Sequence, residues 1–331
     1  MHIAARRRAE ERKAFRQRGG GRCIALVSLS FFTRFMVYCA HQGERSRGME
    51  YEGQICRPPM ERASYMLPIA VGCAYNQCRF CTLFKHLRYR ELPLSQVEAE
   101  LARVKMLGGD PKRIFLGDGN PFGLRTEHLL EILELIHRYF PDCYDINMDA
   151  TVTNVAEKRD GELRRLRDEG VRELYLGIES GMNELLLYMK KDHTVAEAYE
   201  QIERLKAAGL VFNAHIMTGL AGAGKGLENA ERTAEFLNKT VPDKIINFTI
   251  YLHKVAPLYR DVEAGRFLPA SELENLCEER RLLECLTAPI RSYDGFNDHL
   301  AVRTRGKLPC DREKMLSHLD EAILCERRRT A

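Results

Sequence analysis

Three closely spaced cysteines are the residues whose types and spacing point most directly to chemistry. Cys73, Cys78 and Cys81 form a C-x4-C-x2-C pattern directly after the apolar run Met66 to Val71. Thiolates are the usual protein ligands of iron–sulfur clusters. A four-iron cluster that is held by only three cysteines keeps one iron free to bind a small molecule. The pattern therefore predicts an iron–sulfur site that can also bind a ligand.

Zinc is the alternative metal for these thiols. His86 follows Cys81 at a spacing that completes a C-x4-C-x2-C-x4-H set, which could hold a structural Cys3His zinc ion. The protein would then be a zinc-stabilised binding protein without catalysis. A structural zinc site does not need a long α/β domain behind it, but the pattern of such a domain follows here. We therefore favour an iron–sulfur cluster and keep zinc as the alternative.

The other eight of the 11 cysteines show no paired spacing. A chain of 331 residues is long enough to bury a large core without disulfide bonds. Scattered cysteines in such a chain favour the reducing cytosol over an oxidising compartment. We therefore expect a cytoplasmic protein.

The net charge of +4 is distributed unevenly along the chain. Residues 1–48 contain 11 Lys and Arg but 3 Asp and Glu, which gives +8. The 40 basic and 44 acidic residues that remain give residues 49–331 a net charge of −4. Because nucleic-acid-binding folds usually carry a basic excess, we do not expect a nucleic-acid partner.

The first 48 residues form a segment of their own. A basic stretch, Arg6 to Arg18, precedes the mostly apolar run Ile24 to Cys39. Arg34 interrupts this run and leaves it well short of the roughly 20 apolar residues of a membrane-spanning helix. We interpret residues 1–48 as a basic, disordered extension, with Met49 as an alternative start, and we expect no membrane association.

From Met49 onward, short apolar runs alternate with amphipathic stretches. The predicted strands are Met66–Val71, Arg113–Leu116, Tyr144–Met148, Glu173–Ile178, Leu210–Met217 and Ile245–Leu252. The predicted helices are Ser95 to Gly108, Glu127–Tyr139, Glu162–Glu169, Thr194 to Gly209 and Leu227–Asn238. Six repeats predict a parallel α/β architecture, and both an open six-stranded barrel and a doubly wound sheet fit. In either fold the active groups lie at the C-terminal ends of the strands, where the cysteines fall.

Capping boxes predict three helix starts. They are Ser95-Gln96-Val97-Glu98, Thr194-Val195-Ala196-Glu197 and Ser271-Glu272-Leu273-Glu274. The third opens a charged helix that ends near Leu286, and an irregular stretch and a final helix, Arg312 to Glu326, follow it. We therefore divide the chain into the extension (1–48), a core (49–268) and a helical tail (269–331).

The cysteine motif resembles that of the radical S-adenosylmethionine (SAM) superfamily. Its members carry three cysteines after the first strand, with an aromatic residue before the third, here Phe80. The spacing C-x4-C-x2-C is that of a subgroup. The segments 256–259 and 265–267 further resemble the core of enzymes related to coproporphyrinogen dehydrogenase and the methylthiotransferases. The resemblance covers roughly Tyr51 to Phe267 and implies a partial (β/α)6 TIM-like barrel with a helical C-terminal tail.

The resemblance implies two cofactors and their sites. Cys73, Cys78 and Cys81 would hold a [4Fe–4S] cluster, whose open iron would bind SAM. The residues that would contact SAM are Gly117, Asp118, Gly119 and Asn120 around its amine, Glu179 and Ser180 at the ribose, and Ile216 and Gly219 at the adenine. The family resemblance further implies that the reduced cluster cleaves SAM to a 5′-deoxyadenosyl radical, which abstracts hydrogen from a substrate. It also implies a ferredoxin- or flavodoxin-type electron donor.

Several smaller signals have competing interpretations. The segment Gly219 to Gly226 is similar to the phosphate-binding P-loop motif, but Gly226 stands where that motif needs Ser or Thr. We therefore expect no nucleotide phosphate here, and expect the glycines to let the backbone approach SAM. Cys277, Cys285 and Cys310 could hold a second cluster or be plain core and surface cysteines. Lys190-Lys191 is predicted to be a solvated helix end, and Asn297-Asp298-His299 either closes over the barrel mouth or forms a polar turn.

Overall fold

The computed structural model describes residues 52, 56–296 and 302–330. The predicted extension 1–48 lies outside these residues, and so does the group Asn297-Asp298-His299. Both interpretations therefore stay predictions.

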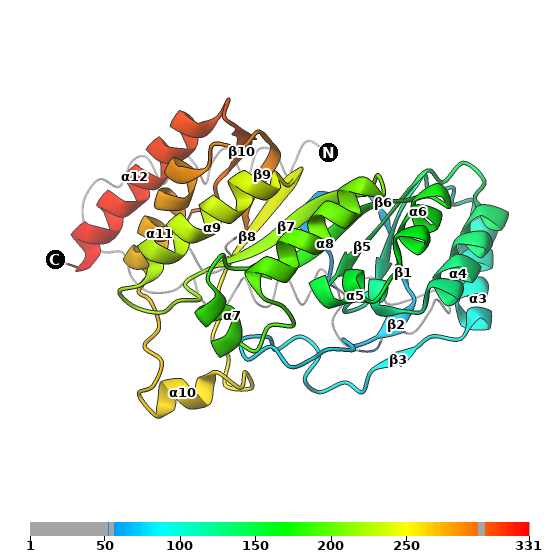
Figure 1. Cartoon of the computed structure of the whole chain (residues 1–331), viewed down its shortest axis with the longest axis horizontal. Helices are drawn as coiled ribbons and strands as arrows, with labels where there is room; N and C mark the ends of the chain where they lie inside the picture. The colour runs from blue at the N-terminus through cyan, green and yellow to red at the C-terminus, as the bar shows by residue number, and fades with distance from the viewer. Residues whose placement is uncertain (1–51, 53–55, 297–301, 331) are drawn as a thin grey trace, which may run out of the picture. The chain divides into compact units, whose positions relative to one another are not determined.

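Eight strands form one sheet in the order β1-β4-β5-β6-β7-β8-β9-β10 (Figure 1). The strands are β1 Tyr65–Pro68, β4 Arg113–Gly117, β5 Asp145–Ala150, β6 Val171–Glu179, β7 Val211–Thr218, β8 Lys244–Thr249, β9 Ile290–Phe296 and β10 Arg305–Leu308. Neighbouring strands are parallel from β1 to β9, and β10 is antiparallel to β9. A separate two-stranded ladder pairs β2 Ala70–Val71 with β3 Arg90–Glu91.

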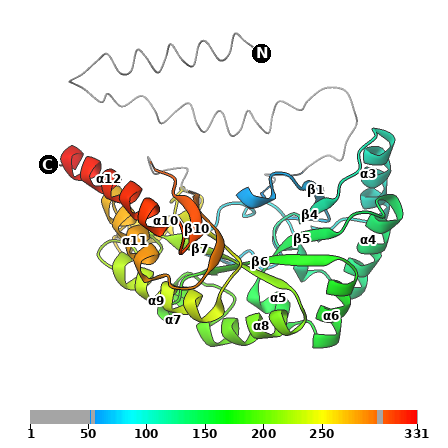
Figure 2. The same ribbon diagram turned by 90° about the horizontal axis from the view of Figure 1, so that it is seen from above.

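Most of the helices follow the parallel strands and lie along the outside of the curved sheet (Figure 2), whereas α10 lies apart from the sheet (Figure 1). They are α3 Leu94–Met106, α4 Thr126–Tyr139, α5 Val152–Ala156, α6 Asp160–Asp168, α7 Asn183–Tyr188, α8 Val195–Ala207, α9 Gly226–Thr240, α10 Tyr259–Glu263, α11 Glu272–Cys285 and α12 Arg312–Thr330. The described part of the chain contains no helix that is both long and apolar enough to cross a bilayer.

The predicted α/β partial barrel is confirmed, since the six predicted strands correspond to β1, β4, β5, β6, β7 and β8. The first predicted strand is broken into β1 and β2 after Pro68. The stretch after Leu286, which was predicted to be irregular, instead contains β9 and β10. The sequence of β9 mixes charged and apolar residues, so its strand conformation depends on the edge that β8 offers.

Two apolar layers lie on opposite faces of the sheet. The larger one fills the space between the strands and the outer helices. The smaller one lies inside the barrel and includes Phe115, Tyr175 and Ile246. The edge-to-face rings of Phe115 and Tyr175, with centroids 6.0 Å apart, pack across this interior. The strands therefore alternate between an outward side chain and one that faces the lumen.

Polar side chains close the N-terminal end of the lumen. The carboxylate of Glu61 is fully buried there and accepts hydrogen bonds from the Tyr175 hydroxyl (2.7 Å) and from Asn147 Nδ2 (3.1 Å). The Lys244 ammonium pairs with the Glu173 carboxylate in the same network. Among the described residues, this network therefore fills the N-terminal end of the lumen, whereas the cysteine loop lies at the C-terminal ends of the strands.

Two of the three predicted capping boxes are formed. Thr194 and Ser271 each accept a hydrogen bond from the third residue of α8 and α11, and the glutamate at that position bonds back. The box at Ser95 is not formed, because Pro93 takes the N-cap position and α3 begins two residues earlier than this box requires. Ser95 therefore already has helical backbone geometry, and its side chain cannot act as an N-cap.

We expect Thr194→Ala to lower the free energy of unfolding by about 1 kcal/mol, because it removes one half of a formed capping box. Ser95→Ala is the matched control and should change stability by less than about 0.5 kcal/mol, since Ala is a better helix former than Ser. Urea denaturation followed by far-UV circular dichroism measures both. Equal losses in the two variants would contradict this account of the helix starts.

Candidate active site

The three cysteines of the motif lie in an irregular loop that follows β2 at the C-terminal ends of the strands. Cys73, Cys78 and Cys81 are half-buried free thiols. Within the described residues, no three His, Cys, Asp or Glu side chains gather closely enough to hold a single metal ion. A cluster makes a different demand, because each thiolate binds a separate iron and the sulfurs need not converge on one atom.

Backbone hydrogen bonds fix this loop against three other turns. Ala74 N donates to Asn120 Oδ1 in the turn after β4 (2.9 Å). Arg79 N donates to Met189 O at the end of α7 (2.9 Å), and Arg79 O accepts from Leu258 N before α10 (2.9 Å). The loop contains almost no regular structure, so these bonds define its path. They also bring four segments that are far apart in sequence to one place.

The glycine turn after β4 lies directly against the cysteine loop. Gly119 has φ +68°, and a Cβ at this position would lie 2.0 Å from Gly72 O and 2.9 Å from Cys73 Cα. Only glycine allows this approach. Asn120 continues the contact, since its Nδ2 donates to Asn154 Oδ1 (2.9 Å) while its Oδ1 accepts from the loop. The predicted amine-binding turn and the predicted cluster loop are therefore adjacent.

Two carboxyl groups near this turn lie in an environment that opposes their charge. Asp118 accepts a hydrogen bond from Gly119 N (3.0 Å), and burial raises its pKa from 3.8 to about 7. Asp149 Oδ1 is out of contact with solvent and has no hydrogen-bond partner among the described residues. Burial also raises the pKa of Asp149 well above 3.8. Buried carboxyls with raised pKa values, one of which has an oxygen without a partner, are typical of sites that bind a polar or cationic ligand.

The inner face of the sheet is open near the mouth. Along β7 the outward residues Ala214 and Ile216 are buried, whereas the inward residues His215 and Met217 stay half-exposed. His215 Nε2 has no partner in the described part of the chain, and burial lowers the pKa of this imidazole to about 3. These two lumen-facing side chains of β7 are therefore only partly covered by protein near the mouth. This fits a barrel that takes its cofactor between the strand ends and the loop.

A buried lysine lies beside the cysteines and corrects one prediction. Lys190-Lys191 was predicted to be a solvated helix end, but the Lys191 side chain is only 5% exposed. Its ammonium lies 3.3 Å from Glu179 Oε1 and 3.7 Å from Asp192 Oδ1. Burial opposes its charge, but the Cys78 thiolate and these two carboxylates outweigh the burial and raise the pKa of Lys191. Lys190 itself is exposed, as predicted.

Lys191 is also the cation that opposes the effect of burial on Cys78, one of the three predicted cluster ligands. Burial raises the pKa of Cys78 to about 11, and the Lys191 ammonium acts in the opposite direction. Metal ligation requires the thiolate form. A buried cation within reach of Cys78 therefore favours ligation at this loop.

The remaining predicted SAM residues lie near the same mouth but differ in what they offer. Glu179 ends β6 with φ +65° and pairs with Lys191. The hydroxyl of Ser180 instead points into the protein, where it donates to Asn229 Oδ1 (2.6 Å) and accepts from Met182 N (3.1 Å). Ile216 packs its side chain in the outer core, so only its backbone, paired with Glu179 across the strands, can face the mouth.

The glycines at 219 and 226 are required by close packing against α11, which the sequence did not reveal. A Cβ at Gly219 would lie 2.6 Å from Asn275 Oδ1, and one at Gly226 would lie 2.6 Å from Glu278 Oε2. Both partners belong to α11, and Gly219 N donates to Glu278 Oε2 (2.9 Å). The segment is therefore packed against α11. Its proposed approach to SAM stays a prediction.

Three site residues were missed by reasoning from the sequence. Lys191 stands in a charged turn, which is usually solvated, and its ammonium is buried beside Glu179 at the end of β6 and near Cys78. Asp149 had a weak signal, since it directly follows the predicted strand Tyr144–Met148, at the C-terminal end where active groups are expected. Arg79 lies inside the cysteine motif and forms an ion pair with Asp261, 182 residues away. No local pattern predicts such a pair.

The fold and the site together define a class of protein. A partial α/β barrel carries its thiol loop, its glycine turn and the buried carboxyls of Asp118 and Asp149 at the C-terminal ends of the strands, where barrel enzymes bind cofactors and substrates. The family model of the radical SAM superfamily matches residues 67–237, which is more than half of the chain. The chain therefore belongs to the radical SAM superfamily, whose members are enzymes that bind a [4Fe–4S] cluster and SAM and act on a substrate with the help of a reductant.

Relatives with known roles match parts of the chain. It is 26% identical to the heme chaperone HemW of Bacillus subtilis over 208 residues, which are 60% of this chain and 53% of that protein. It is 30% identical to the anaerobic magnesium-protoporphyrin IX monomethyl ester cyclase of Cereibacter sphaeroides over 197 residues, 59% of this chain and 31% of the cyclase. The chain thus spans about half of the first relative and a third of the second.

Solved structures support the fold. The coproporphyrinogen III oxidase HemN of Escherichia coli, a radical SAM enzyme, superimposes with a TM-score of 0.56 at 17% identity, over 76% of this chain and 61% of that one. The zinc alternative with His86 as fourth ligand finds no support in the family match. Cys277 and Cys285 pack against the outer core, and Cys310 is exposed, as expected of plain core and surface cysteines.

We expect Lys191→Met to destabilise the protein by roughly 3 kcal/mol, because it leaves the buried carboxylates of Glu179 and Asp192 without their shared cation. Lys190→Met is the matched control on the neighbouring, exposed residue and should change the free energy of unfolding by less than about 0.5 kcal/mol. Urea titrations of the two variants measure the difference. Similar midpoints would show that Lys191 is solvated after all.

The raised pKa of Asp118 predicts a pH dependence. The folded protein keeps this proton up to about pH 7, whereas an unperturbed Asp releases it near 3.8. Folding therefore takes up a proton between these values, and this group makes the free energy of unfolding fall as the pH rises from about 4 to 7. Asp118→Asn keeps the acceptor for Gly119 N and should flatten this slope. Urea midpoints at several pH values test it, and parallel curves for variant and wild type would refute the assignment.

Proposed function

We propose that this protein is a radical SAM enzyme in which Cys73, Cys78 and Cys81 hold the [4Fe–4S] cluster. The observation that carries the proposal is the direct contact between the cysteine loop and the glycine turn, through Ala74 N to Asn120 Oδ1 and the close packing of Gly119. When bound, the reduced cluster supplies an electron that cleaves SAM to a 5′-deoxyadenosyl radical, which abstracts hydrogen from the substrate.

The chain's own residues would bind and orient SAM between the loop and the strand ends. Asp118 and the backbone of the turn 117–120 offer acceptors for the SAM amine. Glu179 offers carboxylate oxygens to the ribose hydroxyls, which are donors. Ser180 would hold the backbone of that strand end through its bond to Asn229, and the backbone at Ile216 and Gly219 would lie along the adenine.

The loop and the turns around it would also restrict water. Phe80 packs with Met217, Leu258 and Phe267 in a small apolar cluster at the mouth. This cluster covers one side of the cysteine loop with carbon. Restricting water protects a reactive radical from side reactions and strengthens the electrostatic interactions around it.

The proposal includes a type of electron donor and a cellular compartment. A low-potential one-electron donor of the ferredoxin or flavodoxin type suits a cluster that must be reduced before it acts. The scattered, unpaired cysteines favour the cytoplasm. The acidic balance of residues 49–331 gives no reason to expect a nucleic-acid partner.

The test is anaerobic reconstitution with iron and sulfide, reduction with dithionite and addition of SAM. A broad visible absorbance with about four irons per chain and the appearance of 5′-deoxyadenosine by chromatography would support the proposal. Colourless protein that retains one zinc ion would overturn it in favour of the structural zinc site. A cluster that never cleaves SAM, even with a stronger reductant, would contradict the radical chemistry.

Replacing Cys73, Cys78 and Cys81 together by Ala should abolish both the cluster absorbance and 5′-deoxyadenosine formation, because no ligand remains. The urea midpoint should change little, since these residues lie in a loop beyond the strands. The control variant Cys277→Ala with Cys285→Ala should keep its iron, and so should His86→Ala. Loss of iron in either control would show that Cys73, Cys78 and Cys81 are not the only metal ligands and would contradict the assignment.

A further inference from the structure

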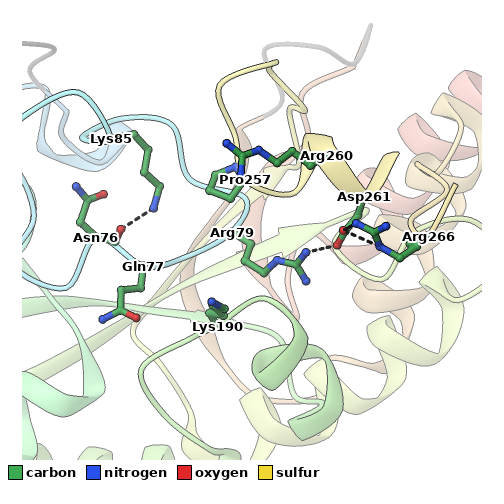
Figure 3. A pocket seen from close by; sticks show the side chains of 9 residues that line it. All are labelled: Asn76, Gln77, Arg79, Lys85, Lys190, Pro257, Arg260, Asp261 and Arg266. Carbon is green, nitrogen blue, oxygen red and sulfur yellow. Dashed lines mark hydrogen bonds and ion pairs between the residues drawn. The ribbon is translucent and has the colours of Figure 1, made fainter. Parts of the chain in front are cut away.

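A cavity of about 490 Å³ begins inside the cysteine loop itself (Figure 3). Three separate segments line it: the loop residues Asn76, Gln77, Arg79 and Lys85, then Lys190 after α7, and Pro257, Arg260, Asp261 and Arg266 around α10. Asn76, Gln77 and Arg79 stand between the first and last thiols of the motif. The volume lies within the range of about 300–1,000 Å³ that small-molecule sites occupy.

The lining of this cavity is strongly cationic. Five of the nine lining residues are Lys or Arg and one is Asp, which gives a formal charge of +4. The chain from residue 49 onward has a net charge of −4, so the cavity concentrates positive charge against the average of the fold. Cations that converge from three segments on a concave surface raise the local potential for anions.

The single carboxylate does not neutralise this charge. Asp261 is bound by Arg79 and Arg266 and accepts from the Tyr188 hydroxyl (2.8 Å). These bonds, first those of Arg266, lower the pKa of Asp261 to about 2. The carboxylate therefore remains charged and serves to hold the two arginines in place, with the Arg79 guanidinium also stacked 4.5 Å above the Tyr188 ring.

The other three cations keep their charge available. Lys85 donates to the neutral carbonyl of Asn76 (2.6 Å). Lys190 and Arg260 are exposed, and within residues 56–296 and 302–330 neither has an ion-pair partner. Figure 3 shows these side chains around the cavity, with Arg260 above Pro257 and Lys190 on the opposite side.

The backbone at this cavity adds an independent observation. Asn76 has φ +42° and Lys190 has φ +51°, in the left-handed region that favours glycine. Glycine is common at this position after a helix, whereas a lysine there is in an unfavourable backbone conformation. The Tyr75 hydroxyl holds this conformation by donating to Lys190 O (2.6 Å). A long cationic side chain at a strained position that is fixed by the cysteine loop indicates a role for the side chain itself.

We propose that this cavity binds the substrate and that the substrate is a small organic molecule with at least two carboxylate or phosphate groups. Arg260 and Lys190, together with Lys85, would contact the anionic groups, since a guanidinium matches a carboxylate or phosphate with two parallel hydrogen bonds. The bound molecule would extend from this rim toward the loop that carries the thiols. The inference rests on the proposed function, because the cavity is a substrate site only if the loop holds the cluster.

The test uses reconstituted protein under anaerobic conditions and two probes, benzene-1,2,4,5-tetracarboxylate and pyrophosphate, in isothermal titration calorimetry. We expect at least one probe to bind and its affinity to fall as NaCl is raised from 50 to 300 mM. Lys190→Glu and Arg260→Glu should each weaken binding at least tenfold. Lys254→Glu is the matched control, since Lys254 is exposed in the same segment but does not line the cavity, and should stay within twofold of wild type.

The outcomes separate the two proposals. Wild-type protein that makes 5′-deoxyadenosine but binds neither probe overturns the anionic substrate alone, and so does an equal loss in Lys254→Glu. If the protein takes up no cluster on reconstitution but still binds a probe through Lys190 and Arg260, the proposed function is overturned and an anion site remains. A 12-nucleotide single-stranded RNA that binds more tightly than both probes and depends on the same residues overturns the small-molecule assignment in favour of a nucleic-acid substrate.

Discussion

The position of the cysteine loop depends on hydrogen bonds to three turns, and the rest of the site depends on this loop. Ala74, Arg79 and Leu258 make the bonds through backbone atoms, so they hold the loop whatever its side chains do. Each partner lies at the C-terminal side of a different strand. The barrel thus determines where the loop can lie, since its strands place those turns around one opening. A loop of this kind holds thiols in position without regular structure of its own.

Burial of charge is the second constraint at this mouth. Thiols and carboxyls that are removed from water tend to stay protonated, as the raised pKa values of Cys78 and Asp118 indicate. The buried Lys191 ammonium counters this for Cys78. Further out, the cations of the cavity face solvent. The site therefore has two parts. Near the thiols, the Lys191 ammonium is paired with buried carboxylates. In the cavity further out, five Lys or Arg residues face a single Asp, so the net charge is positive.

The C-terminal region contacts the barrel through α11 and β9. Helix α11 places Glu278 against the backbone of Gly219 and against Asn229, and Asn229 in turn binds Ser180 at the end of β6. Strand β9 extends the sheet beside β8. A change in α11 would therefore reach two of the strand ends that face SAM in the proposed function. The division of the chain at residue 269 stays a prediction. Strands β9 and β10, which follow that residue, belong to the same sheet as the strands of the core.

The sequence by itself determined the class of the fold and the three thiols, because both depend on local patterns. Strand and helix periods, the boxes at Thr194 and Ser271 and the spacing of Cys73, Cys78 and Cys81 can all be read over a few residues. Only the tertiary structure decided what lies around the thiols. The burial of Lys191, the ion pair of Arg79 with Asp261 and the strand β9 each depend on segments that are distant in sequence. A local pattern contains no information on such contacts, because it is the packing of the barrel that brings them together.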